Sequence, residues 1–426
     1  MSRADTIFAL SSAAGRAGVA VIRVSGHDLH PMMCAMSGRE KITPRHAYFV
    51  SLCDEDDLID RCLITYFAAP HSFTGEDVIE IATHGAPAVV QRVFDFLHAR
   101  FGARMAAPGE FSRRAFHNDK MDLADVDALA ALLAARTERQ RIAALKSITG
   151  DGAQYDAWRR DMIEISAYAA AMLDYNADDL PANISDTIGA RIEKLLGELN
   201  AAISRYAAVR AVRSGFNIVI AGPANAGKSS LFNKIVGSNR AIVSDTPGTT
   251  RDVVCAQIDI DGYLVNLSDT AGLRETDDAI EKIGIEKTRD EIDAADLVIN
   301  MGAPCGGDNE IPVVGKADLN PVRDMANAVY VSAKTGEGID ELMLRLRQKM
   351  HDFMDGASDT VAVNARTYQM IVDAADNLRM ARDMGQNYDL VAEHVRAAAD
   401  AIGRAIGVIT MQEVLDATFS QLCLGK

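Results

Sequence analysis

The sequence predicts a multidomain protein with α/β and all-α parts, in which an α/β domain is inserted into a bundle of long helices. Three observations predict this fold. Short β-rich runs and turns fill residues 1–118, and apolar residues at helical spacing fill 119–212 and return in 353–426. Between 213 and 352, candidate strands and helices alternate. A chain of 426 residues is long enough for several such domains.

The N-terminal part, residues 1–118, is predicted to be an α+β domain. The runs Val19–Val24 and Val78–Ile81 are rich in β-branched residues and indicate strands. Residues Val89–Phe101 carry apolar side chains at helical spacing.

The flanking segments 119–212 and 353–426 are predicted to form one helical domain. Leu129, Leu132 and Leu133 recur at helical spacing, and an alanine-rich pattern from Ile371 to Ile406 does the same. The segment Asp178-Asp-Leu-Pro181 is expected to break the first helical run.

The inserted segment 213–352 is predicted to be a parallel sheet wrapped by helices. Candidate buried strands are Phe216–Ala221, Leu297–Asn300, Ile311–Val314 and Ala328–Val331. The link 301–310 is near the minimum for a parallel crossover and is rich in helix breakers. We therefore expect the usual crossover helix to be lost or reduced there.

Composition narrows the class of protein. The net charge is -16 with an isoelectric point near 5.0, which argues against strong sequence-independent binding to a nucleic-acid backbone. The six cysteines are scattered without Cys-x-x-Cys spacing, so free thiols in a reducing compartment are expected rather than a zinc site. The sequence shows neither a leader nor an apolar run of membrane-spanning length, which predicts a cytoplasmic protein without a membrane anchor.

The strongest motif is Gly222-Pro-Ala-Asn-Ala-Gly227-Lys228-Ser229, which follows a predicted strand and opens a helix. It matches the phosphate-binding P-loop, whose backbone N–H groups and helix N-terminus hold phosphate oxygens. Lys228 is expected to reach the outer phosphates and Ser229 to ligate magnesium. The predicted contact segment consists of Asn225, Ala226, Gly227, Lys228, Ser229 and Ser230.

Two further elements predict a nucleotide-triphosphate switch. Asp269-Thr270-Ala271-Gly272 follows an alternating strand, so its carboxylate is placed to hold magnesium through water. Gly248-Thr-Thr-Arg-Asp252 lies between this element and the P-loop. Thr250 is the candidate magnesium ligand when a nucleotide with a third phosphate is bound.

Guanine is the predicted base. GTPases of this class use Asn-Lys-x-Asp, and this chain has Gly315-Lys316-Ala317-Asp318. Asp318 can still accept from the guanine edge and Lys316 can lie over the ring, but the asparagine amide that anchors the loop is missing. Ser332-Ala333-Lys334 matches the element whose backbone contacts the base oxygen.

Motifs outside the nucleotide site resemble the MnmE (TrmE) family of tRNA-modifying GTPases along essentially the whole chain. The resemblance implies an N-terminal folate-binding and dimerisation domain, a helical domain, and an inserted Ras-like G domain. The motifs are Asp5-Thr-Ile-Phe-Ala9, Gly15-Arg-Ala-Gly-Val19, Arg23-Val-Ser-Gly26, Ser72-Phe-Thr-Gly-Glu-Asp-Val-Ile-Glu80, His84-Gly85, Pro108-Gly-Glu-Phe-Ser-Arg113, Asn118-Asp-Lys-Met-Asp-Leu123 and Cys423-Leu-Gly-Lys426.

The resemblance also implies partners and ligands. Members of the family are homodimers that work with the flavoprotein MnmG (GidA) to modify C5 of the wobble uridine of certain tRNAs. A tetrahydrofolate one-carbon derivative is implied at Arg23, Glu80, Lys120 and Lys426. One carboxylate with several cations suits a pterin edge and an anionic tail. Cys423 is implied to be a catalytic nucleophile, which agrees with a terminal thiol beside a lysine.

Potassium activation is implied by Asn225, since this residue marks potassium-dependent members. The ion supplies the positive charge that an arginine finger supplies elsewhere in phosphoryl transfer. The resemblance adds Ser244, Thr246 and Thr249 as potassium ligands, with Ser244 and Thr249 also near the nucleotide. It names Glu281 as the residue that positions the attacking water.

Two other functions are alternatives to a tRNA-modifying GTPase. A ribosome-assembly switch of the Era or Der type carries a basic RNA-binding module, which this acidic chain does not predict. A folate-dependent transferase with an inactive G domain is disfavoured by intact Lys228, Ser229, Thr250 and Asp269.

Overall fold

A computed structural model of the chain describes residues 5–174, 184–242, 254–269, 291–302, 307–319, 323–355 and 365–405. The chain divides into two compact units, which are described separately below. One unit comprises residues 1–130 with 403–426, and the other comprises residues 131–402.

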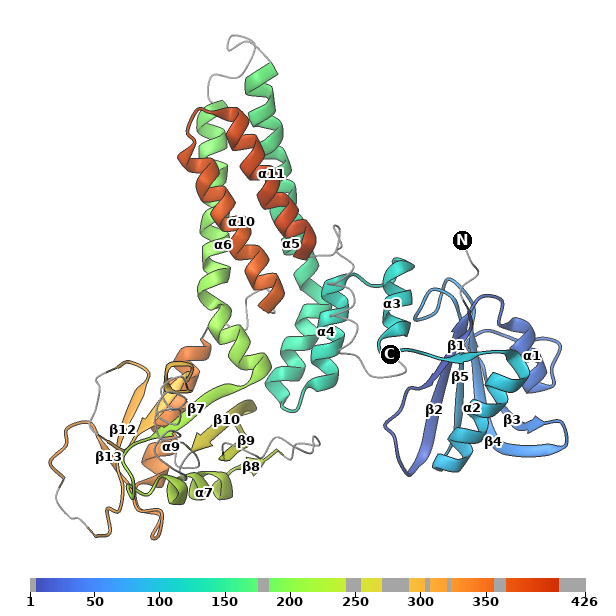
Figure 1. Ribbon diagram of the computed structural model, residues 1–426, viewed down its shortest axis with the longest axis horizontal. Coiled ribbons are helices and arrows are strands. Elements are labelled where there is room, and N and C mark those ends of the chain that lie inside the picture. The colour runs from blue at the N-terminus through green and yellow to red at the C-terminus, as the bar shows by residue number, and fades with distance from the viewer. Residues whose placement is uncertain are drawn as a thin grey trace, which may run out of the picture. The chain divides into compact units, whose positions relative to one another are not determined.

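The N-terminal unit contains a six-stranded sheet, predominantly antiparallel (Figure 1). Only the short edge strand β6 pairs in parallel, with β1. The expected strands at 19–24 and 78–81 are confirmed as parts of β2 and β5, and four further strands complete the sheet. In spatial order the strands are β3 (Ala47–Asp54), β4 (Asp57–Phe67), β5 (Asp77–Gly85), β2 (Ala17–Gly26), β1 (Ile7–Leu10) and β6 (Arg104–Met105).

The two faces of this sheet differ in how far helices cover them. Helices α1 (His30–Ser37) and α2 (Pro87–Phe101) pack on one face, where Met33 and Leu97 join Ile64 and Ile81 in one buried cluster. The expected helix at 89–101 is therefore confirmed. On the opposite face the alternate residues of β3 and β4 are half-buried or exposed, whereas those of β1 are buried in a second, smaller cluster. Arg23 and Glu80 lie on that open face.

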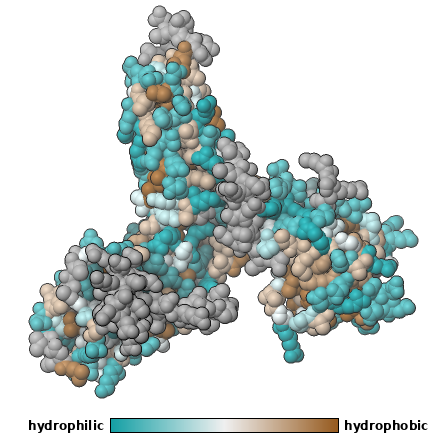
Figure 2. Space-filling view, viewed as in Figure 1, coloured by the Kyte–Doolittle hydropathy of each residue, from teal (hydrophilic) through white to brown (hydrophobic). Residues whose placement is uncertain are grey.

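The long-helix bundle is built from segments on both sides of the inserted domain, as expected. Helix α6 packs against α5 and α10, and it buries Ile188, Ile192, Leu195 and Leu199 at helical spacing. The surface of the bundle in Figure 2 is largely hydrophilic with scattered hydrophobic residues, which fits amphipathic helices. The bundle comprises α5 (Glu138–Asp174), α6 (Ile184–Ser214), α10 (Ala365–Asp383) and α11 (Tyr388–Ala405), preceded by α4 (Leu123–Ala134).

Helix α5 is described to Asp174 and α6 from Ile184. The segment Asp178–Pro181 itself lies outside the described residues. Trp158 ties the two helices together, since its indole N–H donates to Glu198 at 2.8 Å.

The inserted domain contains a seven-stranded sheet that is parallel over five strands and antiparallel at one edge. The expectation of a parallel sheet therefore needs correction, because β9 and β8 run antiparallel to their neighbours. A short hairpin connects β9 to β10, and strands joined in this way run antiparallel; only parallel strands need a crossover. The spatial order is β13 (Val329–Tyr330), β12 (Glu310–Val314), β11 (Leu297–Asn300), β7 (Phe216–Ala221), β10 (Tyr263–Asp269), β9 (Val254–Ile260) and β8 (Arg240–Ala241).

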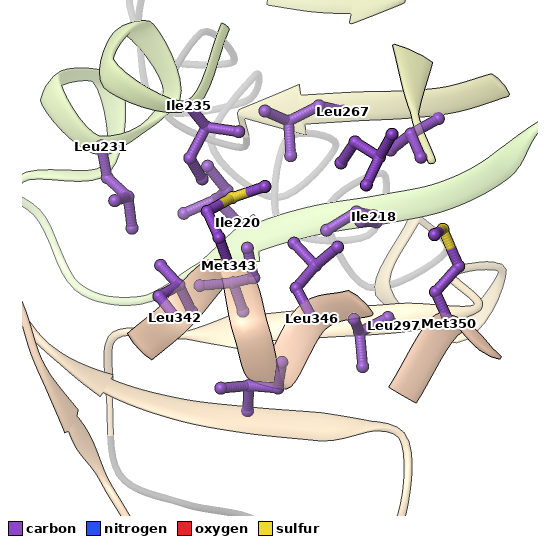
Figure 3. Packing of buried hydrophobic residues seen from close by; sticks show 14 of the residues in the cluster. Ile218, Ile220, Leu231, Ile235, Leu267, Leu297, Leu342, Met343, Leu346 and Met350 are labelled. Carbon is purple, nitrogen blue, oxygen red and sulfur yellow. The ribbon is translucent and has the colours of Figure 1, made fainter. Parts of the chain in front are cut away.

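The core of the inserted domain lies between the sheet and helices α7 (Lys228–Ser238) and α9 (Ile339–Met354). Figure 3 shows Ile218 and Ile220 of β7 close to Met343 and Leu346 of α9. This packing fixes β7, and therefore the loop that follows it, on a rigid support.

A helix through 301–310 is excluded, which confirms the expectation of a lost or reduced helix. Residues 301–302 and 307–309 are not helical, and β12 already begins at Glu310. Residues 303–306 lie outside the described residues.

Candidate functional site

The loop between β7 and α7 has the backbone of a phosphate-binding loop. Gly222, Asn225 and Gly227 have φ of 146°, 63° and 101°. Glycine adopts positive φ without strain, and asparagine tolerates it better than most residues. Gly227 is the N-cap of α7, so the free N–H groups of the first helical turn lie at the loop.

Lys228 is 7% exposed and lies folded against this loop. Its ammonium donates to the carbonyl oxygens of Gly222 and Pro223, both at 3.0 Å. Ser229 and Ser230 follow in the same helical turn and are exposed. A buried cation beside an exposed hydroxyl and free N–H groups suits a polyphosphate with magnesium.

Asp269 ends β10 and is 2% exposed. It pairs in register with Ile220 of β7, two residues before Gly222. The sheet thus places its carboxylate beside the start of the phosphate-binding loop, where it can hold magnesium through water.

The base-recognition loop follows β12 at the same sheet edge. Lys316 has a φ of 58°, and both Lys316 and Asp318 are exposed. The N–H of Ala317 donates to the carbonyl of Val331 at 3.0 Å, which ties this loop to the Ser332-Ala333-Lys334 segment. Ser332 is buried, and its hydroxyl accepts from the N–H of Thr335 at 3.2 Å.

A space too small for a side chain separates the base-recognition loop from the phosphate-binding loop. A Cβ on Gly315 would lie 2.5 Å from the carbonyl oxygen of Ala226 and 2.6 Å from the methyl of Met301. The two loops therefore touch through the backbone of Ala226 and Gly315.

Several of the sequence-predicted residues lie outside the described parts of the chain. The structure says nothing of their placement. They are Ser244, Thr246, Thr249, Thr250, Thr270, Ala271, Gly272, Glu281, Cys423 and Lys426.

In the N-terminal unit, Arg23 and Glu80 form an ion pair on the open sheet face. They are directly opposite on β2 and β5, and two guanidinium nitrogens donate to Glu80 Oε1 at 2.9 and 3.1 Å. The guanidinium carbon lies 5.0 Å from the ring centre of Phe73 and 6.0 Å from that of Phe111. Charge and aromatic surface are thus combined at one place, as a charged, planar ligand requires.

The loop 72–77 before β5 is held from beneath by a buried polar network. Glu76 is 4% exposed and accepts from Arg114 of α3 (Glu110–His117) at 3.0 Å and from the hydroxyl of Ser25 at 2.8 Å. The hydroxyls of Ser25 and Thr74 are 2.7 Å apart. A buried carboxylate with these partners fixes the loop that carries Phe73.

Lys120 reaches the same loop from the segment after α3. A Cβ on Gly75, whose φ is 77°, would lie 3.2 Å from Lys120 Cε and 2.9 Å from Asn118 Cβ. The amide of Asn118 donates to the carbonyl of Thr74 at 2.7 Å. The lysine stem therefore lies on the glycine, two residues from Phe73.

Four residues of these sites were not identified from sequence. Phe73 and Gly75 belong to the motif Ser72–Glu80, and Phe111 belongs to Pro108–Arg113. These motifs indicated the family but did not indicate what the three residues contact. For Met301 the sequence offers no signal, because its contacts depend on how three strands align.

The described cysteines, Cys34, Cys53, Cys62 and Cys255, are free thiols, as predicted. Burial raises the pKa of the Cys62 thiol to about 12, so this group is unreactive in the folded unit. Within the described residues, no helix combines the length and apolarity needed to cross a bilayer.

Comparisons with known proteins cover both units. The family model described as the GTP-binding protein TrmE N-terminus matches residues 6–120, and the MnmE helical domain model matches residues 123–423. The tRNA modification GTPase MnmE of Parvibaculum lavamentivorans is 40% identical, covering 99% of this chain and all of that protein. MnmE of Mesorhizobium japonicum is 37% identical over the full length of both chains.

Among solved structures, the G domain of the FeoB iron transporter of T. maritima is 26% identical. It covers 32% of this chain and 98% of that one, with a TM-score of 0.23, and the assignment does not depend on it. The two family models and the full-length relatives with 37–40% identity agree with the loop geometry described above. The chain belongs to the MnmE family of tRNA modification GTPases.

Proposed function

We propose that this chain is a potassium-activated GTPase that drives modification of tRNA. The product is a carboxymethylaminomethyl-type group at C5 of the wobble uridine, position 34, made together with the flavin-dependent partner MnmG. The observation that carries the proposal is the loop 222–227, with its left-handed backbone, the buried Lys228 and the open N-terminus of α7. Full-length relatives named tRNA modification GTPase support it.

The nucleotide residues take the following roles in this proposal. Lys228 and the N–H groups from Asn225 to Ser230 hold the phosphates, and Ser229 with Thr250 ligates magnesium. Asp318 accepts from the guanine edge, and Lys316 lies over the ring. The remaining nucleotide contacts come from Ser244, Thr249, Asp269, Thr270, Ala271, Gly272, Ser332, Ala333 and Lys334.

Potassium is held at Asn225, whose exposed position in the loop leaves its carboxamide oxygen available from solvent. Ser244, Thr246 and Thr249 supply further oxygens, and the ion neutralises charge that develops on the phosphates. Glu281 positions the water that attacks the outer phosphate.

The Arg23–Glu80 pair is the proposed site for a tetrahydrofolate one-carbon derivative. Glu80 accepts from the donor edge of the pterin, Phe73 offers an aromatic surface, and Lys120 with Lys426 neutralises the anionic tail. The observed pairing of a half-buried arginine with two nearby rings supports this assignment. Cys423 acts as a nucleophile in the transfer chemistry.

The proposed organisation is a cytoplasmic homodimer with no membrane anchor. The domains run over 1–118 (folate binding and dimerisation), 119–212 and 353–426 (helical domain), and 213–352 (G domain). MnmG and substrate tRNA bind to this dimer.

The first experiment measures GTP hydrolysis by the purified chain in potassium and in sodium, with excess ATP as competitor. We expect strong activation by potassium, no competition by ATP, and loss of potassium activation in Asn225→Ala. Lys228→Ala is expected to lose hydrolysis in both salts. Equal rates in the two salts, or inhibition by ATP, would contradict the potassium site or the guanine assignment.

The second experiment tests the product. A deletion strain is complemented with the wild-type chain or with Cys423→Ser, and the wobble uridine is analysed by mass spectrometry of tRNA nucleosides. The wild-type chain should restore the modified nucleoside, and Cys423→Ser should not. Normal modification in the deletion strain would refute the proposed function.

A further inference from the structure

The phosphate-binding loop and the base-recognition loop are in direct contact through Gly315. The carbonyl oxygen of Ala226 points to the place where a side chain at 315 would begin, 2.5 Å from the Cβ position. Real Cβ atoms essentially never come so close to an oxygen. Any side chain at 315 would therefore force the two loops apart at this point.

Met301 lies across the same junction and contacts both loops. Its N–H donates to the carbonyl of Ala221 at 2.7 Å, which extends the pairing of β11 with β7 by one residue. A Cβ on Gly222, at the start of the phosphate-binding loop, would lie 2.9 Å from the Cβ of Met301. The methyl of Met301 is 2.6 Å from the Cβ position of Gly315 and 3.8 Å from that of Gly227, at the loop's end.

The methionine is 8% exposed, and its unbranched side chain fills the space between three glycines. It therefore sets the spacing between the start of the phosphate-binding loop, the end of that loop and the start of the base-recognition loop.

We infer that Gly315 and Met301 together replace the missing asparagine as the anchor that holds the guanine loop against the phosphate loop. Both are positioning residues, since they act through the backbone of Ala226 and through the Lys316–Asp318 segment. A nucleotide must bridge the two loops, so its affinity depends on the distance between them. The inference rests on guanine-nucleotide binding by this chain, which the wild-type measurement below tests separately.

The anchor has a consequence for base selectivity. The guanine 2-amino group is recognised by Asp318, only three residues from Gly315. If the loop shifts, the carboxylate loses its alignment with that amino group, and discrimination between guanine and hypoxanthine decreases. Loosening of the whole domain would instead weaken both nucleotides by the same factor.

The test measures the affinity of the full-length chain for GDP and for IDP by isothermal titration calorimetry. The variants are Gly315→Ala, Gly315→Asn, Met301→Ala and Met301→Leu, and the control is Gly237→Ala in α7. A Cβ at 237 meets nothing within 4 Å, and this glycine has no positive φ.

We expect Gly315→Ala to weaken GDP by about tenfold or more, because the new Cβ displaces the Ala226 carbonyl. Gly315→Asn should weaken GDP as well, although it restores the sequence used by other GTPases. Met301→Ala should weaken GDP by about tenfold, while Met301→Leu, of similar volume, should stay within about twofold of wild type. In each weakened variant the GDP-to-IDP affinity ratio should fall, and Gly237→Ala should leave both affinities unchanged.

Wild-type GDP binding in Gly315→Asn and Met301→Ala would overturn the inference, and so would equal losses for GDP and IDP. If Gly315→Ala does not fold, the two Met301 variants decide the question alone. Absence of GDP binding by the wild-type chain would instead refute the nucleotide assignment.

Discussion

The two candidate sites of this chain differ in whether side chains or backbone groups form them. In the N-terminal unit, the Arg23–Glu80 pair and the Glu76–Arg114 pair are side-chain interactions supported by aromatic rings. In the G domain, the phosphate-binding and base-recognition loops meet through the backbone of Ala226 and Gly315. The first site should respond to changes of charge and pH, whereas the second should respond to a carbon atom added at Gly315.

The physical reason lies in the ligands that each site suits. A polyphosphate is bound by backbone N–H groups, which must approach closely and therefore require glycine. A planar ligand with an anionic tail is selected by placed charges and rings, which side chains provide. The following four predictions, in decreasing order of expected effect, test this difference.

The largest effect is expected at Gly338, the N-cap of α9 in the backbone-built domain. A Cβ there would lie 1.9 Å from the carbonyl oxygen of Tyr330, and φ is 73°. Gly338→Ala should destabilise the G domain by about 3 kcal/mol or more, through overpacking and left-handed strain. Thermal unfolding, with hydrogen exchange of α9 peptides as the local probe, measures this loss.

The matched control is Gly336→Ala, at a φ of 86° but with its nearest neighbour, Lys234 Nζ, 3.9 Å away. It should cost only the strain of positive φ, roughly 1–2 kcal/mol. Equal losses in the two variants would show that close backbone approach does not limit the G domain.

The second effect concerns the side-chain-built site. Arg23→Ala should weaken binding of 5-formyltetrahydrofolate by roughly thirtyfold, since a charged hydrogen-bonding group contributes about 2 kcal/mol. Titration of the full-length chain gives the affinity. Arg92→Ala removes another arginine of this unit, paired with Asp54 and Asp57, and should leave affinity unchanged. A normal affinity in Arg23→Ala would refute the proposed folate site at this pair.

The third effect tests whether a glycine matters in the side-chain-built site as well. Gly75→Ala should displace the stem of Lys120 and weaken 5-formyltetrahydrofolate by about tenfold. Gly102→Ala is the control, because Gly102 also has a positive φ, 64°, but has open space around it. If Gly75→Ala weakens the ligand equally when Lys120 is already alanine, Lys120 is not the group displaced.

The smallest effect is a pH dependence of the N-terminal unit. Burial alone raises the pKa of Glu110, but donors from Arg104, from the Ala107 N–H and from Arg114 outweigh it, and the net pKa is lowered. The carboxyl group thus binds its proton more tightly in the unfolded chain. Its stabilisation is complete above the unfolded pKa, about 4.3, and is lost as pH falls through the folded pKa.

Urea unfolding at several pH values measures the pH dependence of stability. At each pH, the unfolded fraction is read by transferring the sample to one fixed pH and labelling the Cys62 thiol for a fixed short time. Glu110→Gln should make the stability of the unit less dependent on pH below about 4.3. Glu138→Gln is the control, because Arg141 also lowers the pKa of Glu138, but the pair lies exposed on α5. An unchanged pH profile in Glu110→Gln would mean that this network does not contribute to acid stability.

The order of the domains, the phosphate-binding loop and the family could all be predicted from the amino-acid sequence. Each of these depends on residues close together along the chain: the P-loop spans Gly222 to Ser229, and the strand before it has its own apolar pattern. The lost helix at 301–310 was likewise predictable, because the link is too short and too rich in helix breakers.

Contacts between residues far apart in the sequence could not be predicted and depend on the folded structure. Strand register places Arg23 opposite Glu80 across 57 positions and brings Ala226 to Gly315 across 89. A shift of one residue in the pairing of β2 with β5 would turn Arg23 and Glu80 to opposite faces of the sheet. Because register results from the packing of a whole sheet against its helices, neither the aromatic support of Arg23 nor the role of Met301 has a local signature.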